Sequence, residues 1–192
     1  MKKIRVVLIS IVCIGLIVGG YFLLTSKNKQ SSTEDVELTE VQQVITKDLD
    51  KKYPETPRKV VKFFNRITTC YYNEEYTEEE LYGLVDQARA LFDDELAENY
   101  PRKEYAQSVQ ADVAEYHEAN RTIASTSVSS SNDVEYRTVD GDECAYVNVS
   151  YFIKEGKSYN RTYQTFVLRK DEDGKWKILV FYQVEGESSE NE

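Results

Sequence analysis

The chain of 192 residues is long enough for one domain with a hydrophobic core, and its 24 basic and 34 acidic residues give a net charge of −10. Residues 1–30 hold five basic and no acidic side chains, which leaves 19 basic against 34 acidic, a net charge of −15, for residues 31–192. Nucleic-acid affinity needs clustered Lys and Arg side chains that displace counterions from phosphates, so this composition argues against nucleic acid as a partner.

An uncharged apolar run covers residues 6–24 and would span about 28 Å as a helix, close to the hydrocarbon thickness of a membrane. It can be a cleaved signal peptide, a lipoprotein signal acylated at Cys13, or a permanent anchor. The run continues without ending at a small-x-small cleavage site, and Val12 precedes Cys13 where acylation needs a small residue. We therefore predict an uncleaved transmembrane anchor.

Basic side chains and the terminal amine precede this anchor, and the positive-inside rule then predicts the topology. Residues 1–5 are predicted to be a cytoplasmic tail, and residues 25–38 a polar linker. Residues 39–184 are predicted to be an extracellular α+β domain, followed by a disordered tail at 185–192. The expected location is the cell membrane, in a single-pass arrangement with a cytoplasmic N-terminus.

Four helices are predicted in the first half of the domain. Capping-box patterns at Thr39 and Thr77 indicate the starts of the first and third helices. Thr56 before Pro57 indicates the start of the second, and Pro101 that of the fourth. Each start is followed by an apolar stripe at helical spacing. The first helix is expected to end before Pro54. In order, the four stripes are Val41, Val44, Ile45 and Leu49; Val60, Phe63, Phe64, Ile67 and Tyr71; Leu81, Leu84, Val85, Ala88, Leu91 and Phe92; and Tyr105, Ala106, Val109, Val113 and Tyr116.

From Arg121 onward the apolar period falls to two, which predicts strands. The hairpin-like segments "KEGKS" and "KDEDGK" separate three β-rich runs, and the serine-rich residues 122–139 are predicted as an earlier strand with a bulge-like irregularity. A four-stranded antiparallel meander follows. The side chains expected to face the helices are Ala145, Val147, Val149, Tyr151 and Ile153 on the second strand, and Trp176, Ile178, Val180, Tyr182 and Val184 on the last; Lys177 and Gln183 should then face water.

Helices on one face of a curved antiparallel sheet make an α+β domain. The order of elements, the tight turns and the closing "GKWKILVFYQVE" resemble the nuclear transport factor 2-like fold over residues 39–184. That resemblance implies a cone with a pocket between helices and sheet. With its anchor, the chain is also similar to small membrane-anchored proteins of Gram-positive gut bacteria and, more distantly, to VirB-type assembly factors. It departs from the family in having four helices before any strand, and in lacking residues that match the catalytic Asp or His dyads of enzymatic members.

No pattern predicts catalytic residues, a cofactor or a metal site. His117, near Glu115 and Glu118, is the single histidine, whereas a structural metal site needs four donors. The acidic segments "VDGDE" and "KDEDGK" lack the spacing of a calcium loop and are better explained as turns. Cys70 and Cys144 could form a disulfide in an oxidising compartment, but their helix and strand faces favour free thiols.

The 15 tyrosines are the one compositional excess, and they suit contact surfaces or pocket walls as well as ordinary sheet packing. Tyr151, Trp176 and Tyr182 are the candidate pocket or contact residues. We expect a non-catalytic binding or assembly module, anchored in the cell membrane, with an envelope protein as partner. The alternative is a small-molecule carrier or enzyme that uses the pocket. A deep cavity lined by Trp176, Tyr182 and a carboxylate of perturbed pKa would favour this alternative.

Overall fold

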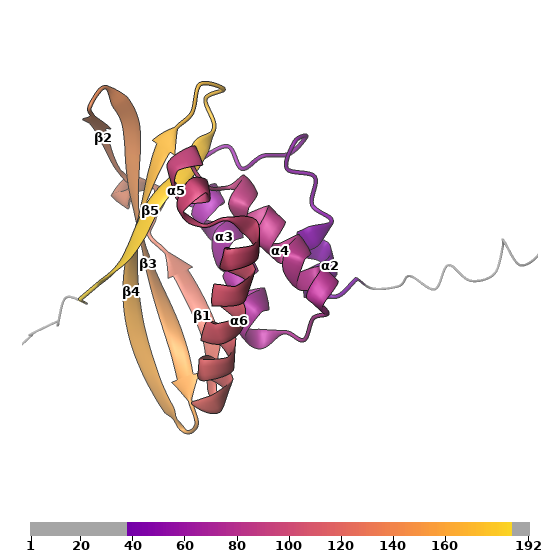
Figure 1. Ribbon diagram of the computed structural model, residues 1–192. Coiled ribbons are helices and arrows are strands. Elements are labelled where there is room, and N and C mark those ends of the chain that lie inside the picture. Colours follow the sequence, from indigo (N-terminus) through magenta and orange to yellow (C-terminus); the bar gives the residue numbers. More distant parts are fainter. Residues whose placement is uncertain (1–37, 186–192) are drawn as a thin grey trace, which may run out of the picture. The chain divides into compact units, whose positions relative to one another are not determined.

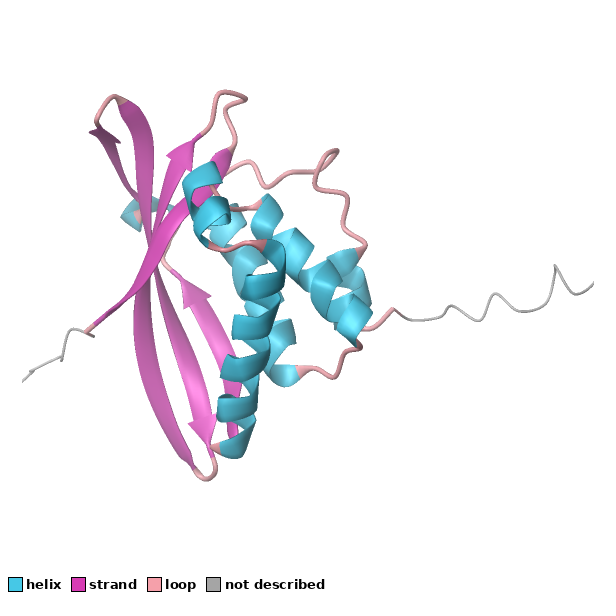
Figure 2. Ribbon diagram, viewed as in Figure 1, coloured by secondary structure: helices cyan, strands magenta, loops and turns pink. Residues whose placement is uncertain are grey.

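The computed structural model describes residues 38–185, in which a layer of helices covers one face of an antiparallel sheet (Figures 1 and 2). The predicted tail at 1–5, the anchor at 6–24, nearly all of the linker and the tail after Glu185 lie outside the described residues. Inside the described range, no helix combines the length and apolar character that a membrane crossing requires. The predicted mixed α+β class with an antiparallel sheet is confirmed.

The α-helices of the described range all precede the sheet. They are α2 (Glu40–Ile45), α3 (Pro57–Asn73), α4 (Glu78–Ala90), α5 (Asp94–Asn99) and α6 (Arg102–Glu118). The predicted capping boxes form at Thr39 and Thr77, and Thr56 caps α3 with Pro57 in its first turn. The short α5 was not predicted, because only one of its six residues, Leu96, is buried and a single apolar position produces no stripe.

The first and third predicted helices are shorter than their apolar stripes. Helix α2 ends at Ile45, and Leu49 is buried from the turn that follows. Beyond α4, Leu91 accepts a hydrogen bond at its carbonyl from the Ile178 backbone, and Phe92 forms an isolated parallel bridge with Ile178. The end of each stripe therefore belongs to a connecting segment that packs on the core.

The sheet has five strands within residues 38–185, so the prediction of a four-stranded meander is wrong. The strands are β1 (Arg121–Val128), β2 (Glu135–Val139), β3 (Asp142–Glu155), β4 (Ser158–Lys170) and β5 (Trp176–Val184), in the order β1-β3-β4-β5 with β2 also paired to β3. The predicted first strand is divided by a 3-10 turn over Ser131–Asp133, whose capping box at Ser130 ends β1. Strand β3 is long enough to pair with both pieces, and the expected irregularity is a register shift between Ile123 and Ser125.

A β-bulge in β5 changes which side chains face the helices. Leu168 of β4 pairs with Ile178, but its neighbour Val167 pairs with Val180, so Leu179 is an extra residue. One extra residue moves every later side chain of the strand to the opposite face of the sheet. Trp176 and Ile178, before the bulge, are buried as predicted.

After the bulge the predicted parity is wrong. Val180 is 40% exposed and Tyr182 46% exposed, both on the outer face of the sheet, away from the helices. Phe181 packs inward against Phe64, and Gln183 lies on the same inner face. Lys177, which was predicted to face water, is half-buried, and its ammonium group donates to the Ala90 carbonyl at 2.8 Å.

An aromatic cluster joins α3 to the inner face of the sheet. The Phe64 ring lies 5.6 Å from the rings of both Phe166 and Phe181, which are 5.3 Å from each other. The predicted inner face of β3 is confirmed, since Ala145, Val147, Val149 and Tyr151 are all buried. Cys70 and Cys144 are free, as expected, and both are buried; burial raises the pKa of the Cys70 thiol to about 12.

Candidate functional site

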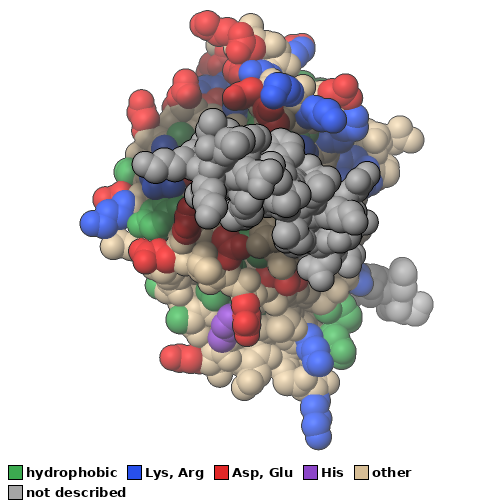
Figure 3. All heavy atoms as spheres, turned by 90° about the vertical axis from the view of Figure 1, so that its right-hand side faces the viewer, with side chains coloured by type: hydrophobic (Ala, Val, Ile, Leu, Met, Phe, Trp, Pro, Cys, Tyr) green, Lys and Arg blue, Asp and Glu red, His purple; other side chains and the backbone are tan. Residues whose placement is uncertain are grey.

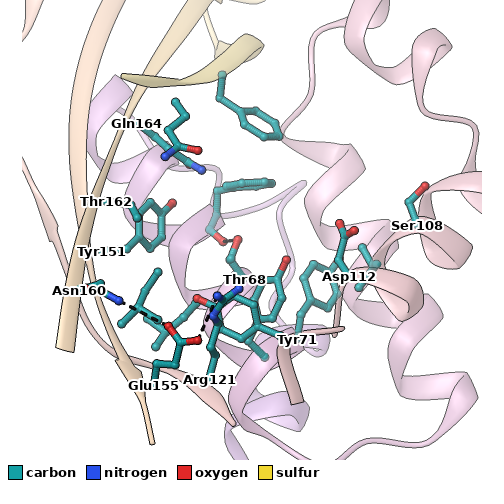
Figure 4. A pocket seen from close by; sticks show the side chains of 18 of the residues that line it. Thr68, Tyr71, Ser108, Asp112, Arg121, Tyr151, Glu155, Asn160, Thr162 and Gln164 are labelled. Atoms are coloured by element: carbon teal, nitrogen blue, oxygen red, sulfur yellow. Dashed lines mark hydrogen bonds and ion pairs between the residues drawn. The ribbon is translucent and has the colours of Figure 1, made fainter. Parts of the chain in front are cut away.

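A cavity of about 540 Å³ lies between the inner face of the sheet and helices α3 and α6 (Figure 4). Ser108 and Asp112 of α6 lie on one side of it, and Thr162 and Gln164 of β4 on the other. Short or polar side chains stand at these positions, where larger apolar ones would fill the space. The described walls include Phe64, Thr68, Tyr71 and Tyr72 of α3; Tyr105, Val109 and Tyr116 of α6; Tyr100 before it; and Ile123, Tyr151, Ile153, Phe181 and Gln183 of the strands.

An ion pair crosses neighbouring strands at one end of the cavity. Arg121 of β1 and Glu155 of β3 are register partners, and the guanidinium donates to the carboxylate at 3.1 Å. The Asn160 amide of β4 donates to the other oxygen of Glu155 at 3.5 Å. The guanidinium also lies 6.0 Å from the centre of the Tyr116 ring. Arg121 and Glu155 therefore neutralise one another.

Tyrosines supply six of the twelve neutral polar side chains in the described wall. Tyr151 donates at 2.7 Å to Asn65, whose amide nitrogen is buried without a partner in the described part of the chain. Tyr71 is 3% exposed, and its hydroxyl makes no well-formed hydrogen bond there, although it lies near Tyr105. Burial raises the pKa of Tyr71 and of Tyr105 well above the ordinary value, and raises that of Tyr72 to about 12. These phenols are neutral at physiological pH.

Asp112 is a carboxylate on the exposed side of α6, at the edge of the cavity. It forms no ion pair within residues 38–185, and its charge contributes to the raised pKa of Tyr72 and of Tyr105. Among the described wall residues, the charged side chains are Asp112, Glu155 and Arg121, so the wall carries one net negative charge.

The three residues singled out from the sequence lie in different places. Tyr151 is in the cavity wall. The Trp176 ring packs against Tyr136, and its carbonyl accepts a hydrogen bond from Tyr53, away from the cavity. The bulge in β5 puts Tyr182 on the outer face of the sheet.

Sequence reasoning did not identify the residues of α6 and the Arg121–Glu155 pair as parts of one site. A weak signal exists in α6, where Ser108 and Asp112 interrupt the apolar stripe next to Val109. The chain reverses direction at Asn120, between α6 and β1, and this reversal brings Arg121 and Glu155 opposite α6. No local sequence pattern predicts that arrangement.

The remaining candidate chemistry has structural explanations. His117, the single histidine of the chain, is exposed (Figure 3), and its Nε2 lies 3.1 Å from the Tyr72 carbonyl, a contact that joins α6 to α3. The Asp171 carboxylate accepts a hydrogen bond from the Lys175 backbone and so shapes the turn before β5. Across residues 38–185, no three His, Cys, Asp or Glu side chains converge in a way that could hold a metal ion.

The model of a protein family described as a domain of unknown function, DUF6715, matches residues 1–181 of the chain. No curated protein matches the chain. The family match extends over the predicted anchor as well as over nearly all of the domain that contains the cavity.

Proposed function

The chain belongs to the DUF6715 family of unknown function, and we propose that its residues 38–185 form a binding domain that holds a small amphipathic molecule in the cavity. The observation that carries the proposal is the cavity itself. Its volume of about 540 Å³ falls within the range of about 300–1,000 Å³ that is typical of ligand sites. Protein interiors are otherwise close-packed, so a hollow of this size between helices and sheet needs an explanation.

The wall suits a ligand with an apolar body and a few polar groups. Ile123, Ile153 and Phe181 offer apolar surface, while Thr162 and Gln164 offer hydroxyl and amide groups on the facing strand. A pocket that is mainly apolar, with a few convergent polar groups, is the usual form of a small-molecule site. The helices on one sheet face and the cavity between them also support the resemblance to the nuclear transport factor 2-like fold, which remains a proposal.

The proposal is for binding without catalysis. Within the described wall there is no His, Cys or Lys side chain, and one of the two carboxylates, Glu155, is engaged with Arg121 and Asn160. General acid–base catalysis needs a donor and an acceptor positioned on the same substrate. Asp112 and the neutral phenols are a poor pair for that role and a good set for recognition.

A fragment screen tests the proposal. Amphipathic fragments are screened by ligand-observed NMR against the protein and against Ser108→Trp, which places an indole over the cavity. Gln107→Trp, at the adjacent exposed position of α6 that is not in the wall, is the matched control. We expect fragments that bind the protein and Gln107→Trp and not Ser108→Trp, with similar melting temperatures for all three. Equal binding to both variants would show that the cavity is not the site.

We also propose that residues 6–24 tether the domain outside the cytoplasmic membrane. The uncharged run and the basic residues before it support this location. Protease added to intact protoplasts should remove the domain and leave a membrane-bound fragment. A full-length chain that survives the protease, or a mature N-terminus after residue 24, would contradict it.

A second candidate function is contact with an envelope protein through the outer face of the sheet. The exposure of Val180, Tyr182 and Tyr159 on the strands favours it, because tyrosine side chains are enriched at protein interfaces. In chains solubilised from their own membrane, Tyr182→Glu should abolish a larger complex, and Gln110→Glu on exposed α6 should preserve it. An unchanged complex size in Tyr182→Glu would argue against this surface.

A further inference from the structure

Of the three charged side chains in the described cavity wall, two form an ion pair with each other and one does not. Arg121 and Glu155 are paired at 3.1 Å and cancel, whereas Asp112 has no ion-pair partner within residues 38–185. An anionic ligand would have to compete with Glu155 for the guanidinium, which is the one basic group of the described wall. A cationic ligand would meet a carboxylate that has no other partner.

Aromatic rings lie beside this carboxylate. Tyr72 of α3 and Tyr116 of α6 are 4.5 Å apart between ring centres, and Tyr100 and Tyr105 are 5.7 Å apart. All four belong to the cavity wall, as does Asp112. The negative face of an aromatic ring attracts a cation, and quaternary ammonium groups are bound in proteins by such sets of rings. Burial keeps the phenol of Tyr72 neutral by raising its pKa to about 12, so the ring does not compete as an anion.

The interior of the cavity is less charged than its edge. Ile123, Ile153 and Val109 contribute apolar surface, and the buried Tyr71 hydroxyl lacks a well-formed hydrogen bond within the described residues. An unsatisfied buried hydroxyl costs free energy, which a ligand with one polar group would recover. The wall therefore carries its unpaired charge at α6, whereas the charges on its strand side, Arg121 and Glu155, are paired with each other (Figure 4).

We propose that the cavity binds an organic cation, a protonated or quaternary amine whose charged end lies between Asp112 and the tyrosine rings of α3 and α6. The uncharged body of the ligand extends toward the inner face of the sheet. This inference rests on the proposed binding function and specifies its ligand class.

Two probes of equal shape isolate the charge. Benzyltrimethylammonium carries one positive charge, and neopentylbenzene is the neutral molecule in which carbon replaces the nitrogen. Their dissociation constants are measured by NMR titration against the full chain. Because a desolvated cation–π contact favours the charged ligand, we expect the cation to bind about tenfold more tightly than its neutral isostere.

Substitutions in the cavity wall test where the cationic probe binds. Asp112→Asn keeps the shape of the side chain and removes its charge, and it should weaken the cation at least about fivefold while leaving the neutral probe unchanged. Glu118→Gln removes the same charge at an exposed position of α6 outside the wall and should change neither constant. Tyr72→Phe should retain the preference for the cation and Tyr72→Leu should lose it, with thermal melts to show that both variants are folded.

The outcomes separate the two proposals. Equal affinities for the two probes, with both lost in Ser108→Trp, would overturn the cation inference and leave the binding function standing. A cation preference that survives Asp112→Asn and Tyr72→Leu would also overturn it. If neither probe binds and the fragment screen finds no ligand that Ser108→Trp excludes, both proposals fail.

Discussion

The two ends of the inner sheet face differ in how they meet the helices. At one end Leu168 and Ile178 are completely buried, and the segment from Leu91 to Asp93 pairs directly with Ile178. At the other end the strands present Thr162 and Gln164 to a cavity. The same sheet thus has a close-packed end and a hollow end, and the proposed binding site lies only at the hollow end.

The rings of Phe64, Phe166 and Phe181 mark the boundary between these ends. Phe64 and Phe181 belong to the cavity wall, while Phe166 is completely buried behind them. Phe181 faces inward only because Leu179 is an extra residue in β5. A single bulge therefore completes the packed end and places Phe181 and Gln183 on the cavity.

The largest effect should come from a charge placed at the packed end. Ile178→Asp would bury a carboxylate without a cationic partner, and we expect it to lower the free energy of unfolding by about 5 kcal/mol or more, enough to unfold a marginally stable domain. Val180→Asp, two residues later and exposed on the outer face, should cost no more than about 1 kcal/mol. Urea denaturation measures both. Equal losses would mean that the bulge is misplaced.

The next largest effect concerns an ion pair at the packed end. Arg169 donates two hydrogen bonds to the buried carboxylate of Asp93, at 2.6 and 3.1 Å, and one to Glu95. Arg169→Met would leave Asp93 buried and charged without its partner, so we expect a loss of about 3 kcal/mol in urea denaturation. The double variant with Asp93→Asn removes that charge and keeps an N-cap for α5, and it should be more stable than Arg169→Met alone. A double variant that is less stable would contradict this explanation.

Removing the Phe181 ring, at the boundary between the packed end and the hollow end, should have an intermediate effect on the free energy of unfolding. Phe181 is half-buried, and Phe181→Ala deletes its contacts with Phe64 and Phe166 and enlarges the cavity, which we expect to cost about 2 kcal/mol. Thr162→Ala, also in the wall and without a packed ring, should cost about 0.5 kcal/mol. The melting temperatures compare them. If Phe181→Ala and Thr162→Ala have the same melting temperature, Phe181 does not stabilise the packed end.

The smallest effect is a pH dependence at α2. Hydrogen bonds from Arg66, one of them at 3.0 Å, lower the pKa of Glu40 below 4.5. Because the folded-state pKa is the lower one, this stabilisation is present above pH 4.5 and is lost as the pH falls through the folded-state value. Both side chains are more than a third exposed, so Glu40→Gln should cost only about 0.5 kcal/mol at pH 7.

Urea denaturation across pH checks this dependence. The difference between the protein and Glu40→Gln should disappear at low pH. Glu75→Gln, in the exposed turn before α4, serves as the control and should follow the unchanged protein throughout. A difference that grows as the pH falls would contradict the sign of the effect.

Features that depend on residues close together in the chain could be predicted from the sequence. The caps at Thr39, Thr56 and Thr77 were predicted because each is a side-chain contact with the backbone within one turn. The inner face of β3 was predicted because its alternation is apolar on one side and polar on the other. The mixed α+β class follows from these local patterns.

The register of β5 and the position of the cavity depend on long-range packing and could not be predicted from the sequence. Both faces of β5 are apolar, with Trp176 and Val180 at even positions and Leu179 and Phe181 at odd ones, so alternation cannot locate a bulge. Pairing with β4 and packing on Phe64 choose the inward side chains. The cavity likewise depends on where α6 lies relative to strands that follow it, a long-range arrangement that leaves no periodic signal in the chain.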